Sequence, residues 1–145
     1  MKKIIKKAIY IAEEYAIKQL REGMNRSERE GVIIFADDQK KFIIDPGKVY
    51  VGQINEDNEP DAIVTVDRYQ GQFQIVSEQI FIFSTGKGYE FNTSIESDMR
   101  ILDLKDRIIT AEVPTHSRNS PLFHCPSCRE VRKFKFIKGE LVLVE

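Results

Sequence analysis

Several features of membrane and nucleic-acid-binding proteins are missing from this 145-residue chain. No stretch has the roughly 20 consecutive apolar residues that a membrane-spanning helix needs. Lys and Arg total 22 against 23 Asp and Glu, and this net charge of −1 does not favour general binding to polyanions. Internal repeats and low-complexity tracts are also missing. We therefore expect one domain over residues 1–145, long enough to bury a core.

The N-terminus begins as an export signal does but does not continue as one. Met1–Ile5 places lysines ahead of isoleucines, yet Lys6, Lys7, Glu13 and Glu14 interrupt the apolar stretch that should follow. No small-residue cleavage site follows either. We therefore expect either a cytoplasmic protein or an exported protein whose signal lies outside this sequence.

Residues 4–21 have the periodicity of an amphipathic helix. The apolar face consists of Ile5, Ala8, Ile9, Ala12, Ala16 and Leu20. Gly23 suits the position just past the helix end. Because this face is rich in alanine and lacks Trp and Phe, we expect it to pack on a sheet rather than lie on a membrane.

The β-rich region, residues 32–145, is centred on Ile80–Phe83. Four successive apolar residues indicate a strand that is covered on both faces. Shorter extended segments surround it and are separated by turn signals such as Asp45-Pro46-Gly47, where Pro presets φ and Gly supplies a positive φ. The predicted fold class is α+β, with the N-terminal helix packed on a curved antiparallel β-sheet of roughly eight strands.

An acidic turn between two of the predicted strands has the spacing of a calcium-binding loop. Asn55, Asp57 and Asp61 match the third, fifth and ninth positions of the pattern D-x-N-x-D-G-x-x-D, whose oxygens wrap a hard cation. Gln53 stands at the first position, and Asn58 replaces the glycine of the sharp turn. We interpret the segment as a structural connection, with a weak calcium site as the alternative.

The only two cysteines, Cys125 and Cys128, lie near the only two histidines, His116 and His124. A C-x-x-C spacing suits a short-range disulfide, a zinc knuckle or a redox pair. The pair follows a Pro-rich loop and leads into a strand, whereas a redox pair needs a helix N-terminus. We favour a disulfide, which would indicate an oxidising compartment, over reduced structural thiols, a zinc site or redox activity.

A basic run near the end of the chain is interleaved with aromatic residues. The run consists of Arg129, Arg132, Lys133, Lys135 and Lys138. Alternation places Phe134 and Phe136 opposite Lys133 and Lys135, so we expect the aromatic rings in the core and no nucleic-acid partner. The chain has no phosphate-binding loop, no nucleophile elbow and no His-Glu pair at helical spacing, so no catalytic residues are predicted.

The order of these motifs resembles that of a group of small exported bacterial proteins. Residues 48–64 are similar to their pattern G-D-[LI]-N-x-D-G-x-x-D-A-[IV]-V. A strand and glycine turn at Ile80–Tyr89, then Asp106–Ala111, then a Cys-bearing loop before an aromatic strand complete the order. The mycobacterial LppP/LprE-type lipoproteins look like this over residues 48–144, although Cys-Pro-Ser-Cys stands here for their Cys-Cys-Pro-Ser and no lipobox cysteine is present. The resemblance implies an exported protein with no established activity.

We therefore predict a non-catalytic, extracytoplasmic accessory or binding protein of a bacterial envelope, without a cofactor. We expect it to bind a protein partner and to be a monomer or a small homo-oligomer. One alternative is a cytoplasmic inhibitor or immunity-type protein that binds a partner through its acidic turn. Another is a small-ligand-binding module or hydrolase with a cavity between helix and sheet.

Overall fold

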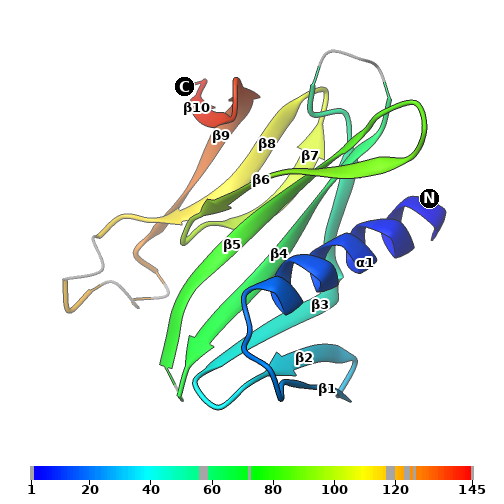
Figure 1. Ribbon diagram of the computed structural model, residues 1–145. Helices are drawn as coiled ribbons and strands as arrows, with labels where there is room; N and C mark the ends of the chain where they lie inside the picture. Colours follow the sequence, from blue (N-terminus) through cyan, green and yellow to red (C-terminus); the bar gives the residue numbers. More distant parts are fainter. Residues whose placement is uncertain are drawn as a thin grey trace.

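The fold consists of a helix followed by strands that form two sheets (Figure 1). The computed structural model describes residues 2–55, 59–71, 73–116, 120–122, 125 and 127–144. The elements in these ranges are α1 (Lys2–Lys18), β1 (Asn25–Arg29), β2 (Val32–Ala36), β3 (Lys40–Gly52), β4 (Asp61–Gln70), β5 (Phe73–Ser84), β6 (Tyr89–Glu96), β7 (Arg100–Lys105), β8 (Ile108–Pro114), β9 (Arg129–Ile137) and β10 (Glu140–Leu143).

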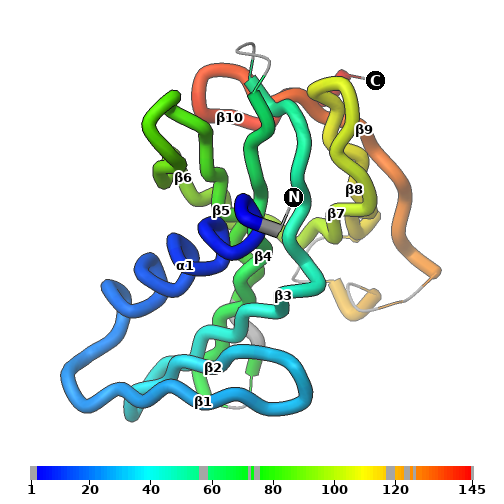
Figure 2. Tube along the Cα trace, turned by 90° about the vertical axis from the view of Figure 1, so that its right-hand side faces the viewer, coloured from blue at the N-terminus to red at the C-terminus, as the bar shows by residue number. Residues whose placement is uncertain are grey.

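All neighbouring strands are antiparallel, and the elements are stacked in three layers. One sheet has six strands in the order β1-β2-β3-β4-β5-β6, and the other has four in the order β10-β9-β8-β7. Figure 2 shows α1 on one side of β3 and β4, with β7, β8 and β9 on the other side. The predicted α+β class and the helix on an antiparallel sheet are confirmed, although the described residues form ten strands in two sheets rather than roughly eight in one.

The β5 residues Ile80–Phe83 are covered on both faces of the six-stranded sheet, as their composition predicted. Ile80 and Ile82 are fully buried among residues of α1 and its underlying strands. Phe81 is fully buried on the opposite face, and its ring stacks on Phe136 of the second sheet at 4.6 Å between centroids. The six-stranded sheet therefore separates two hydrophobic cores.

A line of small side chains holds α1 close to the sheet. Ile4, Ala8, Ala12 and Ala16 recur every fourth residue and are all at most 4% exposed. Alanine has no side chain beyond Cβ, so the helix backbone can approach the strands closely. The most buried line thus contains Ile4 rather than the predicted Ile5, and α1 ends at Lys18, three residues before the predicted end at Arg21.

The predicted turn at Asp45-Pro46-Gly47 is wrong, because these residues form a bulge inside the continuous strand β3. Asp45 Oδ1 accepts a 2.8 Å hydrogen bond from the backbone N–H of Gly47. Gly47 does not have a positive φ. A bulge tolerates proline, since its residues need not donate hydrogen bonds to the neighbouring strand. The residues of β3 before and after the bulge both pair with β4, so the strand continues past it.

The bulge reverses which face each β3 side chain occupies. Ile44 pairs with Val66 and Val49 pairs with Val64, so β3 advances five residues while β4 advances two. In a regular strand, two residues five positions apart face opposite sides of the sheet, so the bulge shifts the alternation of the side chains by one residue. Val49 therefore packs on the α1 side, as Ile44 does, and Lys48 and Tyr50 face the second sheet.

The two sheets touch closely where β3 ends. A Cβ atom built on Gly52 would lie 2.8 Å from the carbonyl oxygen of Leu104 in β7, so this contact requires glycine. Farther along the second sheet, Phe134 and Phe136 pack into the core between the sheets, whereas Lys133 and Lys135 are exposed. The predicted alternation of β9 is confirmed.

No described helix combines the length and the apolar character needed to cross a membrane.

Candidate ligand cleft between the two sheets

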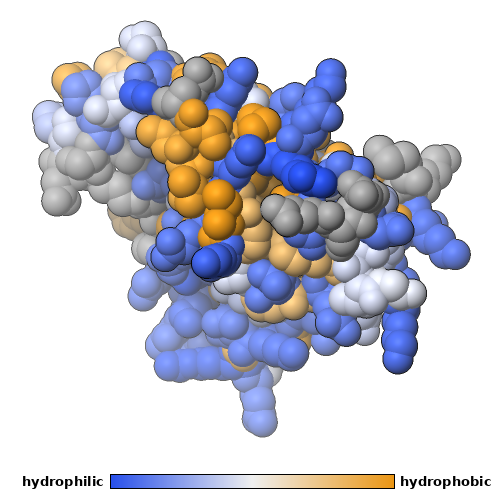
Figure 3. All heavy atoms as spheres, turned by 90° about the horizontal axis from the view of Figure 1, so that it is seen from above, coloured by the Kyte–Doolittle hydropathy of each residue, from blue (hydrophilic) through white to orange (hydrophobic). Residues whose placement is uncertain are grey.

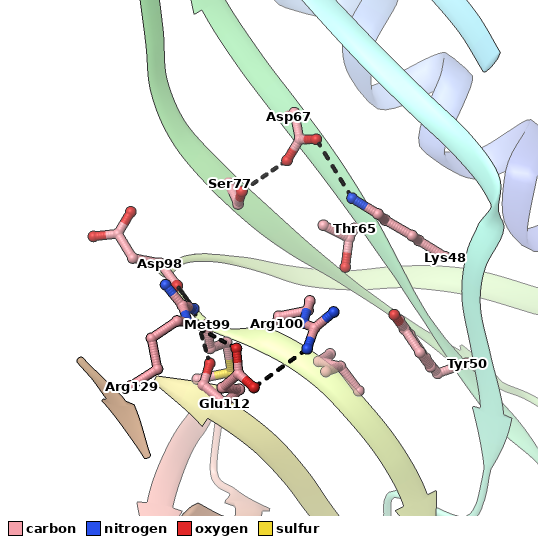
Figure 4. Close-up of a pocket in the computed structure, with 11 residues that line it drawn as sticks. Lys48, Tyr50, Thr65, Asp67, Ser77, Asp98, Met99, Arg100, Glu112 and Arg129 are labelled. Carbon is pink, nitrogen blue, oxygen red and sulfur yellow. Dashed lines mark hydrogen bonds and ion pairs between the residues drawn. The ribbon is translucent and has the colours of Figure 1, made fainter. Parts of the chain in front are cut away.

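A cleft of about 310 Å³ opens between the two sheets (Figure 4). Strands β3, β4 and β5 form one wall, and the second sheet and the segment before β7 form the other. Three cations and three carboxylates line it, namely Lys48, Arg100, Arg129, Asp67, Asp98 and Glu112. The opposing charges suit a polar ligand group that is neutral overall better than a polyanion.

Asp67 organises the charged groups on the wall of the six-stranded sheet. Its Oδ1 accepts a 2.7 Å hydrogen bond from the hydroxyl of Ser77, and its Oδ2 lies 4.0 Å from Lys48 Nζ. Figure 4 shows the three side chains converging above the cleft. Ser77 and Asp67 face each other across β4 and β5, so the sheet register fixes this pair.

A buried amide lies next to these groups. Thr65 lines the cleft, and its hydroxyl donates a 2.7 Å hydrogen bond to Gln79 Oε1. Gln79 is fully buried, and its Nε2 has no hydrogen-bond partner among the residues that the structure describes. A buried amide nitrogen normally has an acceptor, so this group is a donor poised beside the cleft.

Glu112 holds two arginines on the opposite wall. Its Oε1 accepts a 2.9 Å hydrogen bond from Arg129 Nε, and its Oε2 accepts one of 3.2 Å from Arg100 Nη2. Arg129 Nη2 also donates to the carbonyl oxygens of Asp98 and Glu112, at 3.1 and 3.2 Å. Arg129 is thereby fixed, while the Arg100 side chain remains 61% exposed at the mouth.

Tyr50 places a phenol between the two walls. Burial raises its pKa above the usual value of 10.0, an effect that Arg100 opposes and Asp45 reinforces. The neutral hydroxyl is therefore available as both donor and acceptor at ordinary pH.

The predicted cysteine pair directly precedes, in the sequence, a residue of the cleft wall. The sulfur atoms of Cys125 and Cys128 are at disulfide-bonding distance, with their Cα atoms 5.1 Å apart. The carbonyl oxygen of Cys128 accepts hydrogen bonds from Thr115 N and Thr115 Oγ1, at 2.9 and 2.8 Å. The next residue is Arg129, so the cysteine loop and the cleft share a boundary.

The zinc site at the cysteine pair stays a prediction. His116 lies half-buried just after β8, and His124 is outside the described residues. Within the described part of the chain, no three His, Cys, Asp or Glu side chains converge as metal ligands do.

Among the described residues of the acidic turn, Asp61 is a buried carboxylate. Asp61 is fully buried and accepts backbone hydrogen bonds from Ser84 at 2.9 Å, Ile54 at 3.3 Å and Asn55 at 3.4 Å. Its carboxylate thus ties the turn to the end of β5. Asn55 is half-buried, and Asp57 lies outside the described residues, so the calcium alternative is still only a prediction.

Two hollows larger than the cleft lie away from it, among the residues that the structure describes. The first, of about 630 Å³, is lined by apolar residues such as Phe83 and Phe136 and by Arg107, Lys135 and Lys138. It lies at the end of the molecule seen in Figure 3, where apolar atoms gather in a band bordered by polar ones. The second is a groove of about 520 Å³ between α1 and β6.

The sequence does not predict any of the residues that line the cleft as site residues. They come from separate strands, and the β3 bulge that turns Lys48 and Tyr50 inward was interpreted as a turn. One usable signal was Arg129, a base placed immediately after the cysteine pair. Comparisons with protein-family models, with curated proteins and with solved structures found no match to this chain.

Proposed function

We propose that this chain is a non-catalytic binding protein of an extracytoplasmic, oxidising compartment, and that it recognises its partner at the cleft between the sheets. The observation that carries the proposal is the junction at Cys128 and Arg129, where the cysteine pair adjoins the cleft wall. Disulfides persist mainly in oxidising compartments. The resemblance to LppP/LprE-type lipoproteins supports the same location.

The charges of the cleft favour recognition over catalysis. Glu112 is shared by two arginines, and Asp67 accepts a hydrogen bond from the Ser77 hydroxyl while lying near Lys48. These carboxylates are already engaged in hydrogen bonds and ion pairs within the protein, which leaves them less available to a substrate but holds them in place to orient a polar group of a protein partner.

The compartment is tested by trapping thiols with an alkylating agent in cells that express the native gene, before lysis. We expect Cys125 and Cys128 to be unmodified until a reductant is added. Two alkylated cysteines without reductant would overturn the extracytoplasmic assignment.

The cleft is tested by chemical cross-linking in the same cells. We expect Arg100→Glu to abolish the cross-linked adducts of the native protein, because it reverses a charge at the mouth. The matched control is Arg132→Glu, which alters an exposed arginine on β9 that pairs with Glu130 outside the cleft. Identical adducts from both variants and the native protein would show that the partner binds elsewhere.

A small-ligand-binding module is the second candidate function. The observation that favours it is the groove of about 520 Å³ between α1 and β6, because this volume is within the ~300–1,000 Å³ of small-molecule sites. A groove between the helix and the sheet is the kind of cavity that this alternative requires.

A further inference from the structure

The groove between α1 and β6 combines aromatic rings with carboxylates. Its lining includes four rings and two acids, namely Tyr10, Tyr15, Tyr89, Phe91, Glu14 and Glu90. Tyr10 and Phe91 both line this groove and are 59% and 43% exposed, so the groove presents large rings to solvent. Rings of this kind are a feature of sites that bind organic cations.

The groove carries net negative charge. Glu14 and Glu90 are exposed and form no ion pair within 4.0 Å in the part of the chain that the structure describes. Lys18 is the cation on the same lining. Two carboxylates against one ammonium group leave an excess of one negative charge beside the rings.

A buried carboxylate behind the groove accepts a hydrogen bond from one of its rings. The Tyr15 hydroxyl donates a 2.6 Å hydrogen bond to Glu78 Oε1, and the Tyr15 ring stacks on Phe91 at 5.4 Å between centroids. Glu78 is 2% exposed, and its Oε2 accepts no hydrogen bond among the described residues, with Arg68 Nη1 at 3.7 Å. A hydrogen bond to a carboxylate makes a phenol ring more electron-rich, which strengthens its attraction for a cation.

Cations of the protein gather at the other end of the helix. Lys3, Lys6 and Lys7 line a hollow of about 300 Å³ together with Tyr10, which also lines the groove. Tyr10 is thus shared by an aromatic, acidic site and a basic one. Because Tyr10 lines both sites, a ligand with an ammonium group in the groove and an anionic group toward the lysines would contact both.

We propose that the groove binds the quaternary ammonium group of a soluble phosphocholine-type compound, with its phosphate facing the lysines beside Tyr10. A quaternary ammonium group cannot donate hydrogen bonds, so aromatic faces suit it, and the carboxylates of the groove balance its charge. This inference rests on the second candidate function and does not involve the cleft.

Calorimetric titration of the full chain with phosphocholine tests the proposal. We expect saturable binding, and we expect 3,3-dimethylbutyl phosphate, which has carbon in place of the ammonium nitrogen, to bind about tenfold more weakly or less. Equal binding of the two compounds, or no binding of phosphocholine, would overturn the proposal. Equal competition by inorganic phosphate would also overturn it, because the lysines alone would then account for binding.

Three variants locate the ligand. Glu90→Gln and Phe91→Ala should each weaken phosphocholine binding several-fold, and Glu90→Gln alters an exposed side chain without removing core contacts. The control is Phe73→Ala, which removes a 78% exposed ring that does not line the groove. Equal effects of all three would contradict the assigned site.

Vesicles of phosphatidylcholine distinguish the source of the head group. Sedimentation with vesicles in the absence of binding to free phosphocholine would replace the soluble ligand with a membrane surface and overturn the proposal. A failure of phosphocholine to bind would leave the proposed cleft function intact, because thiol trapping and Arg100→Glu report on residues that do not line the groove.

Discussion

The hydroxyl of Tyr15 donates a 2.6 Å hydrogen bond to the nearly inaccessible carboxylate of Glu78. This bond joins α1 to β5 across the core between the helix and the six-stranded sheet. Ser94 of β6 donates a hydrogen bond to the same Glu78 oxygen at 3.2 Å. Burial and the Glu78 carboxylate raise the pKa of Tyr15 above 10.0, while the Ser94 hydrogen bond and Arg68 oppose them. The helix is therefore held by a polar contact as well as by its alanine face.

Removal of the Tyr15 hydroxyl should destabilise the protein and change its response to alkali. Tyr15→Phe loses a hydrogen bond to a charged group, and we expect about 2 kcal/mol less free energy of unfolding at pH 7. Tyr10→Phe, on the same helix but 59% exposed, should have little effect. Urea unfolding of both variants measures the difference.

The pH dependence follows from the raised pKa. Above pH 10 the unfolded chain loses the Tyr15 proton while the folded protein keeps it, so the free energy of unfolding falls as pH rises through this range. Tyr15→Phe should show a shallower fall above pH 10 than the native protein. Identical slopes would contradict the assigned hydrogen bond.

Asp37 should titrate at an unusually low pH. Its carboxylate accepts backbone hydrogen bonds from Arg21 at 2.9 Å and from Gln39 and Lys40 at 2.7 Å. The Arg21 bond is the largest of the effects that lower its pKa from 3.8 to about 2. This contribution to stability is present above pH 3.8 and is lost as pH falls through 2. Carbon-detected NMR titration measures the midpoint, with Asp38 as the neighbouring reference, and a midpoint near 4 would refute the three-donor arrangement.

The sequence predicts features that depend on the hydrophobic pattern of one segment, but not those that depend on the pairing of distant strands. Four apolar residues at Ile80–Phe83 identified a strand buried on both faces, because that property is visible in a single segment. Asp45-Pro46-Gly47 has the chemistry of a turn, and only the pairing of both flanks with β4 makes it a bulge. The cleft depends on this bulge and on contacts between distant strands, so its charged residues could not be grouped in advance.

Gly52→Ala should separate the two sheets where they are closest. The added methyl group would lie 2.8 Å from the Leu104 carbonyl oxygen, and relief of this overlap should cost about 1–3 kcal/mol. At Gly47 the nearest atom is a side-chain oxygen of Asp45 at 3.2 Å, so Gly47→Ala should cost less. Urea unfolding compares the two, and equal losses would contradict the close approach of β3 and β7.

The cysteine pair should contribute little to global stability. Its loop spans a sequence separation of three residues, so a bond there restricts the unfolded chain only slightly. We expect Cys125→Ser to lower the free energy of unfolding slightly and to increase hydrogen exchange at Thr115 and Cys128, which are joined by two hydrogen bonds. Ser127→Ala, inside the same loop, is the control. A collapse of the whole fold would show that the sulfurs belong to a metal site or an essential core.

Asp61 provides a direct test of whether the acidic turn is structural or binds calcium. Its fully buried carboxylate accepts hydrogen bonds from three backbone N–H groups. Asp61→Asn would place an amide NH₂, itself a donor, against these N–H donors. We expect about 2–3 kcal/mol lower free energy of unfolding, whereas Glu59→Gln, at an exposed position of the same turn, should cost less. Because this role needs no cation, excess Ca²⁺ or a chelator should leave both values unchanged, and calorimetric titration with Ca²⁺ should give little heat. Micromolar calcium affinity that disappears in Asp61→Asn would instead assign the turn to metal binding.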